Sequence, residues 1–89
     1  MATIHFTSAL RRFHPAPPAE VAGATIGAAL AHAFENAPIL RGYVLDDQGA
    51  VRVHVKIFLN DWPIRDSKTL SDPIAPTDSI YVIQALSGG

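Results

Sequence analysis

One amphipathic helix stands between runs of predicted strand, and this order constrains the fold more than any other feature. The stretch TIGAALAHAFENAP, residues 25–38, has Thr25 placed as an N-cap and Pro38 as a stop. Apolar residues recur within it at helical spacing: Ile26, Leu30, Ala33 and Phe34. A helix with one apolar stripe needs a single sheet face to cover it, so the flanking strands should form one sheet.

Strand patterns lie on both sides of this helix. Residues 3–7 alternate, with Ile4 and Phe6 on one face. A weaker edge strand is expected over 19–22, because the prolines before it cannot serve a central ladder. The segment SIYVIQAL, residues 79–86, is predicted to be the closing strand.

A further strand is predicted over VRVHVKIFLN, residues 51–60, which follows a turn containing Gly49 at a positive φ. One face of it is expected to carry Val51, Val53, Val55 and Ile57. The other face is expected to carry Arg52, His54, Lys56 and Phe58. Asn60-Asp61 then predicts a tight hairpin into a short strand at WPI, residues 62–64.

These elements predict an α+β fold, with one main helix packed on a mixed sheet of four to five strands. Strands before and after the helix suggest that the first and last strands lie side by side at the sheet centre. The topology that fits is the ubiquitin-like β-grasp. We expect a domain over residues 1–86 and a flexible tail over residues 87–89.

The composition excludes several classes of function. Seven Lys plus Arg against eight Asp plus Glu give a formal charge of −1, without the basic excess that nucleic-acid binding requires. Without cysteine there is no disulfide framework and no thiolate metal site. No signal peptide or membrane-spanning window is visible, which predicts a cytoplasmic protein that binds neither nucleic acid nor membrane.

The order of several short motifs carries a family resemblance. The stretches VKIFLN (55–60) and LSDPIAPTDSIYVIQALSGG (70–89) resemble the MoaD/ThiS family of sulfur carriers, which end in Gly-Gly. GATIGAAL (23–30) and ILRGYVLDDQGAVRVHV (39–55) resemble its longer members, including carriers linked to cysteine biosynthesis. Asp61 departs from the pattern, which often has glycine in the hairpin, and is expected to strain a left-handed turn by ~1 kcal/mol.

The resemblance implies a carrier or co-substrate rather than an enzyme, or the small subunit of a sulfur-transfer complex. An E1-like adenylating partner would activate the Gly89 carboxylate with ATP, and a sulfur donor would convert it to a thiocarboxylate. A sulfur-accepting synthase would then use that sulfur to make cysteine, thiamine, molybdopterin or a specialised metabolite. The chain has no phosphate-binding glycine loop, so no cofactor is expected on it and the ATP site would belong to the partner.

The tail Ser87, Gly88 and Gly89 suits this chemistry physically. Four residues from Leu86 extend by roughly 13 to 14 Å, enough to reach into another protein's site. Glycine lacks a Cβ, so the tail is thin and its terminal carbonyl stays accessible. Gly89 is therefore the predicted reacting residue.

Partner docking is predicted on the sheet face away from the helix. If Ile80 and Val82 face the core, the adjacent side chains on the closing strand face outward, joined by one from the neighbouring strand and by the last residue of the domain. The predicted contact residues are Phe58, Tyr81, Ile83 and Leu86. Arg11 and Arg12 are expected to steer an acidic partner or to be solvated surface charges.

Two alternative functions stay open on the sequence alone: a ubiquitin-like modifier joined to other proteins through Gly89, and an interaction domain whose tail never reacts. No metal site is predicted, because no pair of the four histidines has ligand spacing. These histidines are His5, His14, His32 and His54. Asp46-Asp47 is predicted to belong to a turn rather than to a catalytic carboxylate pair.

Overall fold

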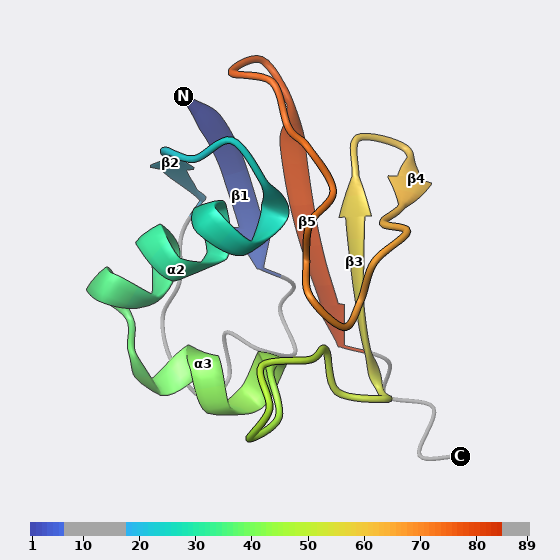
Figure 1. The fold of residues 1–89 in the computed structure, drawn as a ribbon. Coiled ribbons are helices and arrows are strands. Elements are labelled where there is room, and N and C mark those ends of the chain that lie inside the picture. The colour runs from blue at the N-terminus through green and yellow to red at the C-terminus, as the bar shows by residue number, and fades with distance from the viewer. Residues whose placement is uncertain (7–17, 85–89) are drawn as a thin grey trace.

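The computed structural model describes residues 1–6 and 18–84. Within these residues the chain forms five strands and two helices, shown in Figure 1. In chain order they are β1 (Ala2–Phe6), β2 (Ala19–Val21), α2 (Ile26–Asn36), α3 (Ile39–Val44), β3 (Val55–Leu59), β4 (Trp62–Pro63) and β5 (Ser79–Gln84). The predicted α+β class and the five-stranded sheet are therefore confirmed.

The strands form one mixed sheet in the order β2-β1-β5-β3-β4. The first and last strands, β1 and β5, are parallel neighbours, with Ile4 beside Ile80. All other pairings are antiparallel, including that of β3 with β5. The predicted central pair of first and last strands is confirmed.

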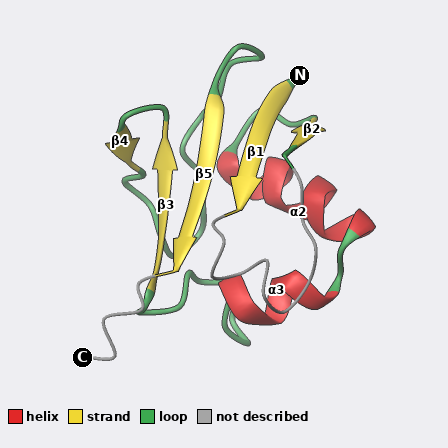
Figure 2. Ribbon diagram, turned by 180° about the vertical axis from the view of Figure 1, so that it is seen from behind, coloured by secondary structure: helices red, strands yellow, loops and turns green. Residues whose placement is uncertain are grey.

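Alternation fixes which side of the sheet is buried. In β1, Ile4 and Phe6 are buried while Thr3 and His5 are half-buried. In β5, Ile80 and Val82 are fully buried, as the sequence predicts. Both helices lie against this buried side, and the opposite side of the sheet faces the viewer in Figure 2.

The helix α2 begins and ends close to the predicted positions. Thr25 is its N-cap, and the Thr25 side chain accepts a hydrogen bond from the Ala28 amide at 3.2 Å. Loop carbonyls accept from the first two helical amides, Leu70 from Gly27 and Asp72 from Ile26, each at 2.9 Å. The buried stripe consists of Ile26, Ala29, Leu30, Ala33 and Phe34.

A second helix, α3, occupies a segment that the sequence analysis leaves irregular. It is six residues long, follows Pro38, and buries Leu40 and Val44 one turn apart. Both side chains belong to the same core as α2. Its burial in that core, rather than intrinsic propensity over so short a segment, stabilises this helix.

The long strand predicted over residues 51–60 is wrong in its first half. Val51 forms only an isolated bridge with Leu45, and the chain turns at Val53 and His54. Val53 is 91% exposed, although the alternation placed it beside Val55 and Ile57, which are buried. The turn arises because the Val55 amide donates to the Arg52 carbonyl at 3.0 Å, which closes a tight loop instead of a ladder.

Candidate functional site

The sheet side opposite the helices carries a patch of apolar and aromatic residues with one lysine, here called the open face. It comprises His5 on β1, Tyr81 and Ile83 on β5, and Lys56 and Phe58 on β3. Tyr81 lies between His5 and Phe58 in the register, and Ile83 lies beside Lys56. The strand pairing thus brings together the predicted contact residues Phe58, Tyr81 and Ile83.

The centre of the open face is a stacked pair. The rings of His5 and Tyr81 lie 4.7 Å apart between centroids, at an interplanar angle of 12°. Tyr81 is 38% exposed and Ile83 is 37% exposed, while Phe58 is half-buried. Large side chains left partly open to water in this way form a surface that another protein can cover.

The alternation of residues 3–7 places His5 on the strand face opposite Ile4 and Phe6, but the sequence does not show that His5 lies beside Tyr81. The signal that could have found it is the parallel pairing of β1 with β5, which sets His5 opposite Tyr81. Among residues 1–6 and 18–84, no group of three or more His, Cys, Asp or Glu side chains could hold a metal ion.

Hydrogen bonds among Asn60, Asp78 and Ser79, here called the polar lock, fix the register between β3 and β5. Asn60 donates its backbone amide to the Ser79 carbonyl at 2.7 Å, and its side-chain oxygen accepts from the Ser79 amide at 3.0 Å. The Asn60 side-chain nitrogen donates to Asp78 at 3.1 Å, and Asp78 also accepts from the Ala75 amide at 2.8 Å. These bonds join the end of β3 to the start of β5, so Phe58 pairs with Tyr81 rather than with a neighbour.

The hairpin between β3 and β4 forms where the sequence predicts it, but the expected strain at Asp61 is wrong. The residue at positive φ is Asn60, at 57°, and Asp61 is not left-handed. Asparagine tolerates this conformation, and here its side chain is held by Asp78 and Ser79. Asparagine therefore suits this position, because it accepts the positive φ and its side chain makes both hydrogen bonds of the polar lock.

The predicted tail, one predicted contact residue and two predicted steering residues lie outside the described residues. These are Ser87, Gly88 and Gly89, then Leu86, and then Arg11 and Arg12. The last described position, Gln84, pairs with Val55 at the first residue of β3. Asp46 and Asp47 form a turn, as predicted. Asp46 accepts hydrogen bonds from the amides of Gln48 and Ala50, and Gly49 has φ 85°.

The Asp66 side chain holds the loop against which the first turn of α2 packs. The Asp66 carboxylate accepts hydrogen bonds from the Ser71 and Thr69 hydroxyls and from the Thr69 amide. Its loop holds Leu70 at φ 59°, with its side chain buried. This buried side chain and its carbonyl are what the first turn of α2 packs upon.

These two carboxylates predict a loss of stability in acid. Hydrogen bonds from Ser71 and Thr69 hold the pKa of Asp66 far below its usual range, and those from Ala75 and Asn60 lower the pKa of Asp78. Because both folded-state pKa values are depressed, the stabilisation is present above the unfolded value of about 3.9 and disappears as pH falls through the folded values. In thermal unfolding experiments from about pH 6 down to about pH 2, the melting temperature should begin to fall once the pH drops below about 4.

The variant Asp66→Asn should be less stable at neutral pH and should show a shallower acid decline, since its side chain has no proton to gain. The control Asp47→Asn changes an exposed turn carboxylate whose side chain makes no hydrogen bond with the rest of residues 1–6 and 18–84, and it should keep the original slope. An unchanged slope in Asp66→Asn would contradict the role given to that carboxylate.

No protein-family model matches the sequence, and no curated protein matches it. Solved structures do match, over nearly all of the chain. A chain of the Amycolatopsis orientalis BexX/CysO complex has a TM-score of 0.85 at 18% identity and covers 100% of both chains. CysO from Mycobacterium tuberculosis, described as an antigen, has a TM-score of 0.82 at 25% identity, over 97% of this chain and 100% of its own.

The fold is the ubiquitin-like β-grasp. SAMP1 from Haloferax volcanii shares it, with a TM-score of 0.80 at 23% identity, over 99% of this chain and 98% of that one. These β-grasp neighbours are of the MoaD/ThiS type, which confirms the resemblance drawn from the motifs. SAMP1 is a small archaeal modifier protein. No helix within the described part of this chain is long and apolar enough to cross a membrane.

Proposed function

We propose that this β-grasp protein is a sulfur carrier that forms a thiocarboxylate at Gly89. The observation that carries the proposal is the position of the exposed Tyr81 and Ile83 on β5, the strand that leads directly into the Gly-Gly sequence. A partner seated on the open face would hold β5 itself, and so would fix the origin of the reacting tail relative to its own active site.

The chemistry divides between the two proteins. The Gly89 carboxylate attacks the α-phosphate of ATP in an E1-like partner, which forms an acyl-adenylate and releases pyrophosphate. A sulfur donor then attacks the acyl carbon and displaces AMP, leaving the thiocarboxylate. This chain contributes the carboxylate and the docking face, while the partner contributes the nucleotide site and the donor.

The structural neighbours support a carrier that works with a partner protein. One match is a chain of a complex between BexX and CysO, and another is CysO itself. A sulfur-accepting synthase for cysteine, thiamine, molybdopterin or a specialised metabolite would receive the sulfur. We favour a cytoplasmic carrier of the cysteine-biosynthesis type or one dedicated to a single pathway, because the middle segment resembles the longer carriers.

A second candidate function is protein modification through Gly89. The match to a small archaeal modifier protein, at a TM-score of 0.80, favours it specifically. Both functions begin with adenylation of the same carboxylate, and they differ in the nucleophile that displaces AMP: a sulfur donor for the carrier, or a lysine amine for the modifier.

The test is the intact mass of the protein after incubation with an E1-like activating enzyme, ATP and sulfide. The carrier predicts replacement of one oxygen by sulfur, localised to Gly89 by fragmentation. Deletion of Gly89 should lower ATP–pyrophosphate exchange by at least about a thousandfold, because the attacking group is displaced from its site. Circular dichroism of the deletion variant controls for folding.

Each other outcome has a defined meaning. Conjugates to lysine side chains with no thiocarboxylate would replace the carrier with the modifier. Full exchange activity after deletion of Gly89 would eliminate both and leave an interaction domain with an inert tail.

A further inference from the structure

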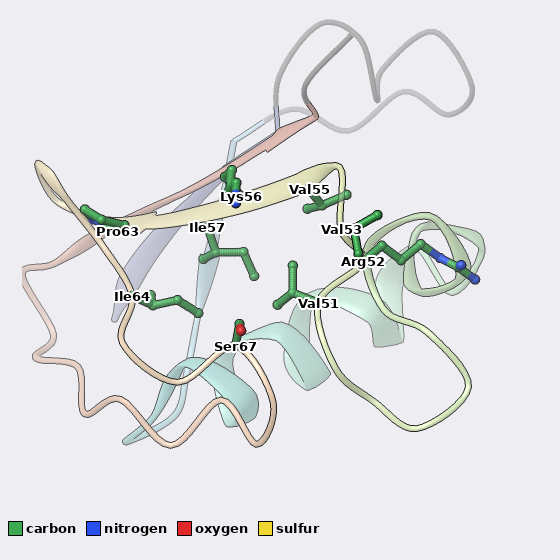
Figure 3. A pocket seen from close by; sticks show the side chains of 9 residues that line it. All are labelled: Val51, Arg52, Val53, Val55, Lys56, Ile57, Pro63, Ile64 and Ser67. Carbon is green, nitrogen blue, oxygen red and sulfur yellow. The ribbon is translucent and has the colours of Figure 1, made fainter. Parts of the chain in front are cut away.

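The outer edge of β3 borders a cleft that shares only Lys56 with the open face. Its volume is about 470 Å³. Figure 3 shows the side chains of Val51, Ile57 and Ile64 turned toward this space, with Ser67 on its opposite wall. The cleft therefore combines apolar side chains with the polar Arg52, Lys56 and Ser67, and it opens at the edge of the sheet.

This edge of the sheet is only partly covered. The two-residue strand β4 pairs with Phe58 and Leu59 and stops there. Beyond it the Ile64 amide donates to the Ile57 carbonyl at 3.0 Å. Within the described part of the chain, no strand lies beside the stretch from Val55 to Ile57 on this outer side.

The ladder geometry shows which backbone groups face the cleft side. Asn60 exchanges hydrogen bonds with Ser79, so in an antiparallel ladder Phe58 and Lys56 also bond toward β5. Val55 and Ile57 consequently turn their amides and carbonyls outward. The Ile57 carbonyl and the Val55 amide already have partners in Ile64 and Arg52. Among the backbone groups of residues 1–6 and 18–84, none bonds to the Ile57 amide or to the Val55 carbonyl on this side, and both point to the open edge.

The charge around the cleft is strongly one-sided. Residues 51–57 and 63–68 contain four basic side chains and one acidic one, whereas the whole chain has seven basic and eight acidic residues. The basic residues are Arg52, Lys56, Arg65 and Lys68. The one acid, Asp66, keeps its negative charge, but it does not line the cleft, whose lining includes Arg52 and Lys56 and no acidic side chain. A negatively charged occupant is favoured.

We infer that this cleft binds an extended acidic segment of a partner protein, which adds to the sheet along Val55–Ile57. Alternate side chains of an added strand point to opposite faces. Apolar residues of the segment enter the cleft between Val51, Ile57 and Ile64, and the intervening carboxylates face Lys56. This second docking surface does not depend on any reaction at Gly89.

The experiment uses the full chain, labelled with ¹⁵N, and two synthetic peptides. One alternates valine with glutamate, and the other alternates valine with lysine. The glutamate peptide should shift amide resonances in residues 51–57 and 63–68 and should slow hydrogen exchange of the Ile57 amide. The lysine peptide should bind at least about tenfold more weakly, because it places cations against the basic rim.

Two variants and a matched control test whether the peptide binds at the cleft. Ser67 has an exposed side chain and bonds to Val51 through its backbone carbonyl, so Ser67→Phe fills the cleft without removing that bond. Ser67→Phe should weaken binding of the glutamate peptide by at least about tenfold. The double variant Arg65→Glu and Lys68→Glu should weaken it by a similar factor. Asn36→Phe adds the same ring at the exposed end of α2 and should leave binding unchanged.

Several results would overturn the inference. Absence of shifts, equal binding of both peptides, or shifts centred on Tyr81 and Ile83 would each do so. Shifts that grow with protein concentration alone would assign the cleft to a second copy of the chain. Cleft shifts caused by deleting residues 85–89, without peptide, would assign it to the chain's own C-terminal segment.

Discussion

Replacing Ile83 by aspartate is expected to weaken binding of the proposed E1-like partner by about a hundredfold, equivalent to roughly 2.7 kcal/mol. Ile83 is 37% exposed, so the substitution should leave the fold intact. It places a carboxylate where an apolar contact is proposed, and docking would bury that charge against β5 beside Tyr81. The desolvation of an unpaired charge opposes docking.

The measurement is the Kd for the partner by calorimetry, together with kcat/KM for adenylation. Ile39→Asp is the matched control, because Ile39 is 52% exposed on α3, on the helix side of the sheet. It makes the same chemical change away from the open face and should alter neither quantity. Equal behaviour of the two variants would mean that the partner does not use the open face.

The second large effect is on stability. Gly23→Ala is expected to lower the free energy of unfolding by about 2 to 4 kcal/mol. Gly23 has φ 147°, and an added Cβ would lie 2.8 Å from the Ala28 Cβ and 2.9 Å from the Ala29 backbone nitrogen. The loop from β2 would then have to move away from α2, which would disturb the hydrogen bond from the Ala22 amide to His32 Nδ1, now 2.6 Å long.

Urea unfolding of the parent protein and of Gly23→Ala checks this expectation. Gly42→Ala is the control variant. Gly42 lies within α3, and nothing lies within 4 Å of the position its Cβ would take. Alanine has the higher helix propensity, so Gly42→Ala should be neutral or stabilising by up to about 1 kcal/mol. A Gly23→Ala variant as stable as the parent would show that the loop can relax at no cost.

The parts of the fold that the sequence predicts are those in which local pattern and burial agree. Ile4 and Phe6 alternate along β1, and Ile80 and Val82 along β5, because each strand has one buried face. The helix α2 has both a periodic stripe and the Thr25 cap. In each case a short stretch of sequence carries enough information to define the element.

The failures occur where distant contacts decide the local structure. Val53 continues a perfect alternation, yet the chain turns there because Arg52 bonds through its amide to the Val44 carbonyl and through its own carbonyl to Val55. The helix α3 is equally difficult to predict from the sequence. Its two buried residues, Leu40 and Val44, stabilise it only through their contacts with the assembled core.

The same distinction applies to the open face. Tyr81 and Ile83 follow from the alternation of β5, and Phe58 from that of β3. The stacking of His5 on Tyr81 depends on register between strands at opposite ends of the sequence, which no local pattern encodes. The Asn60–Asp78 lock likewise joins residues 18 positions apart.

The parallel pairing of β1 with β5 also has a consequence during synthesis of the chain. Thr3 pairs with Ser79, so almost the entire sequence must have left the ribosome before the central ladder can close. Until then β1 has only β2 as a strand neighbour, and a two-stranded ribbon is marginal in water. Contacts between such distant segments slow folding, so nascent chains that lack Ser79–Gln84 should stay sensitive to proteases and become resistant only when β5 emerges.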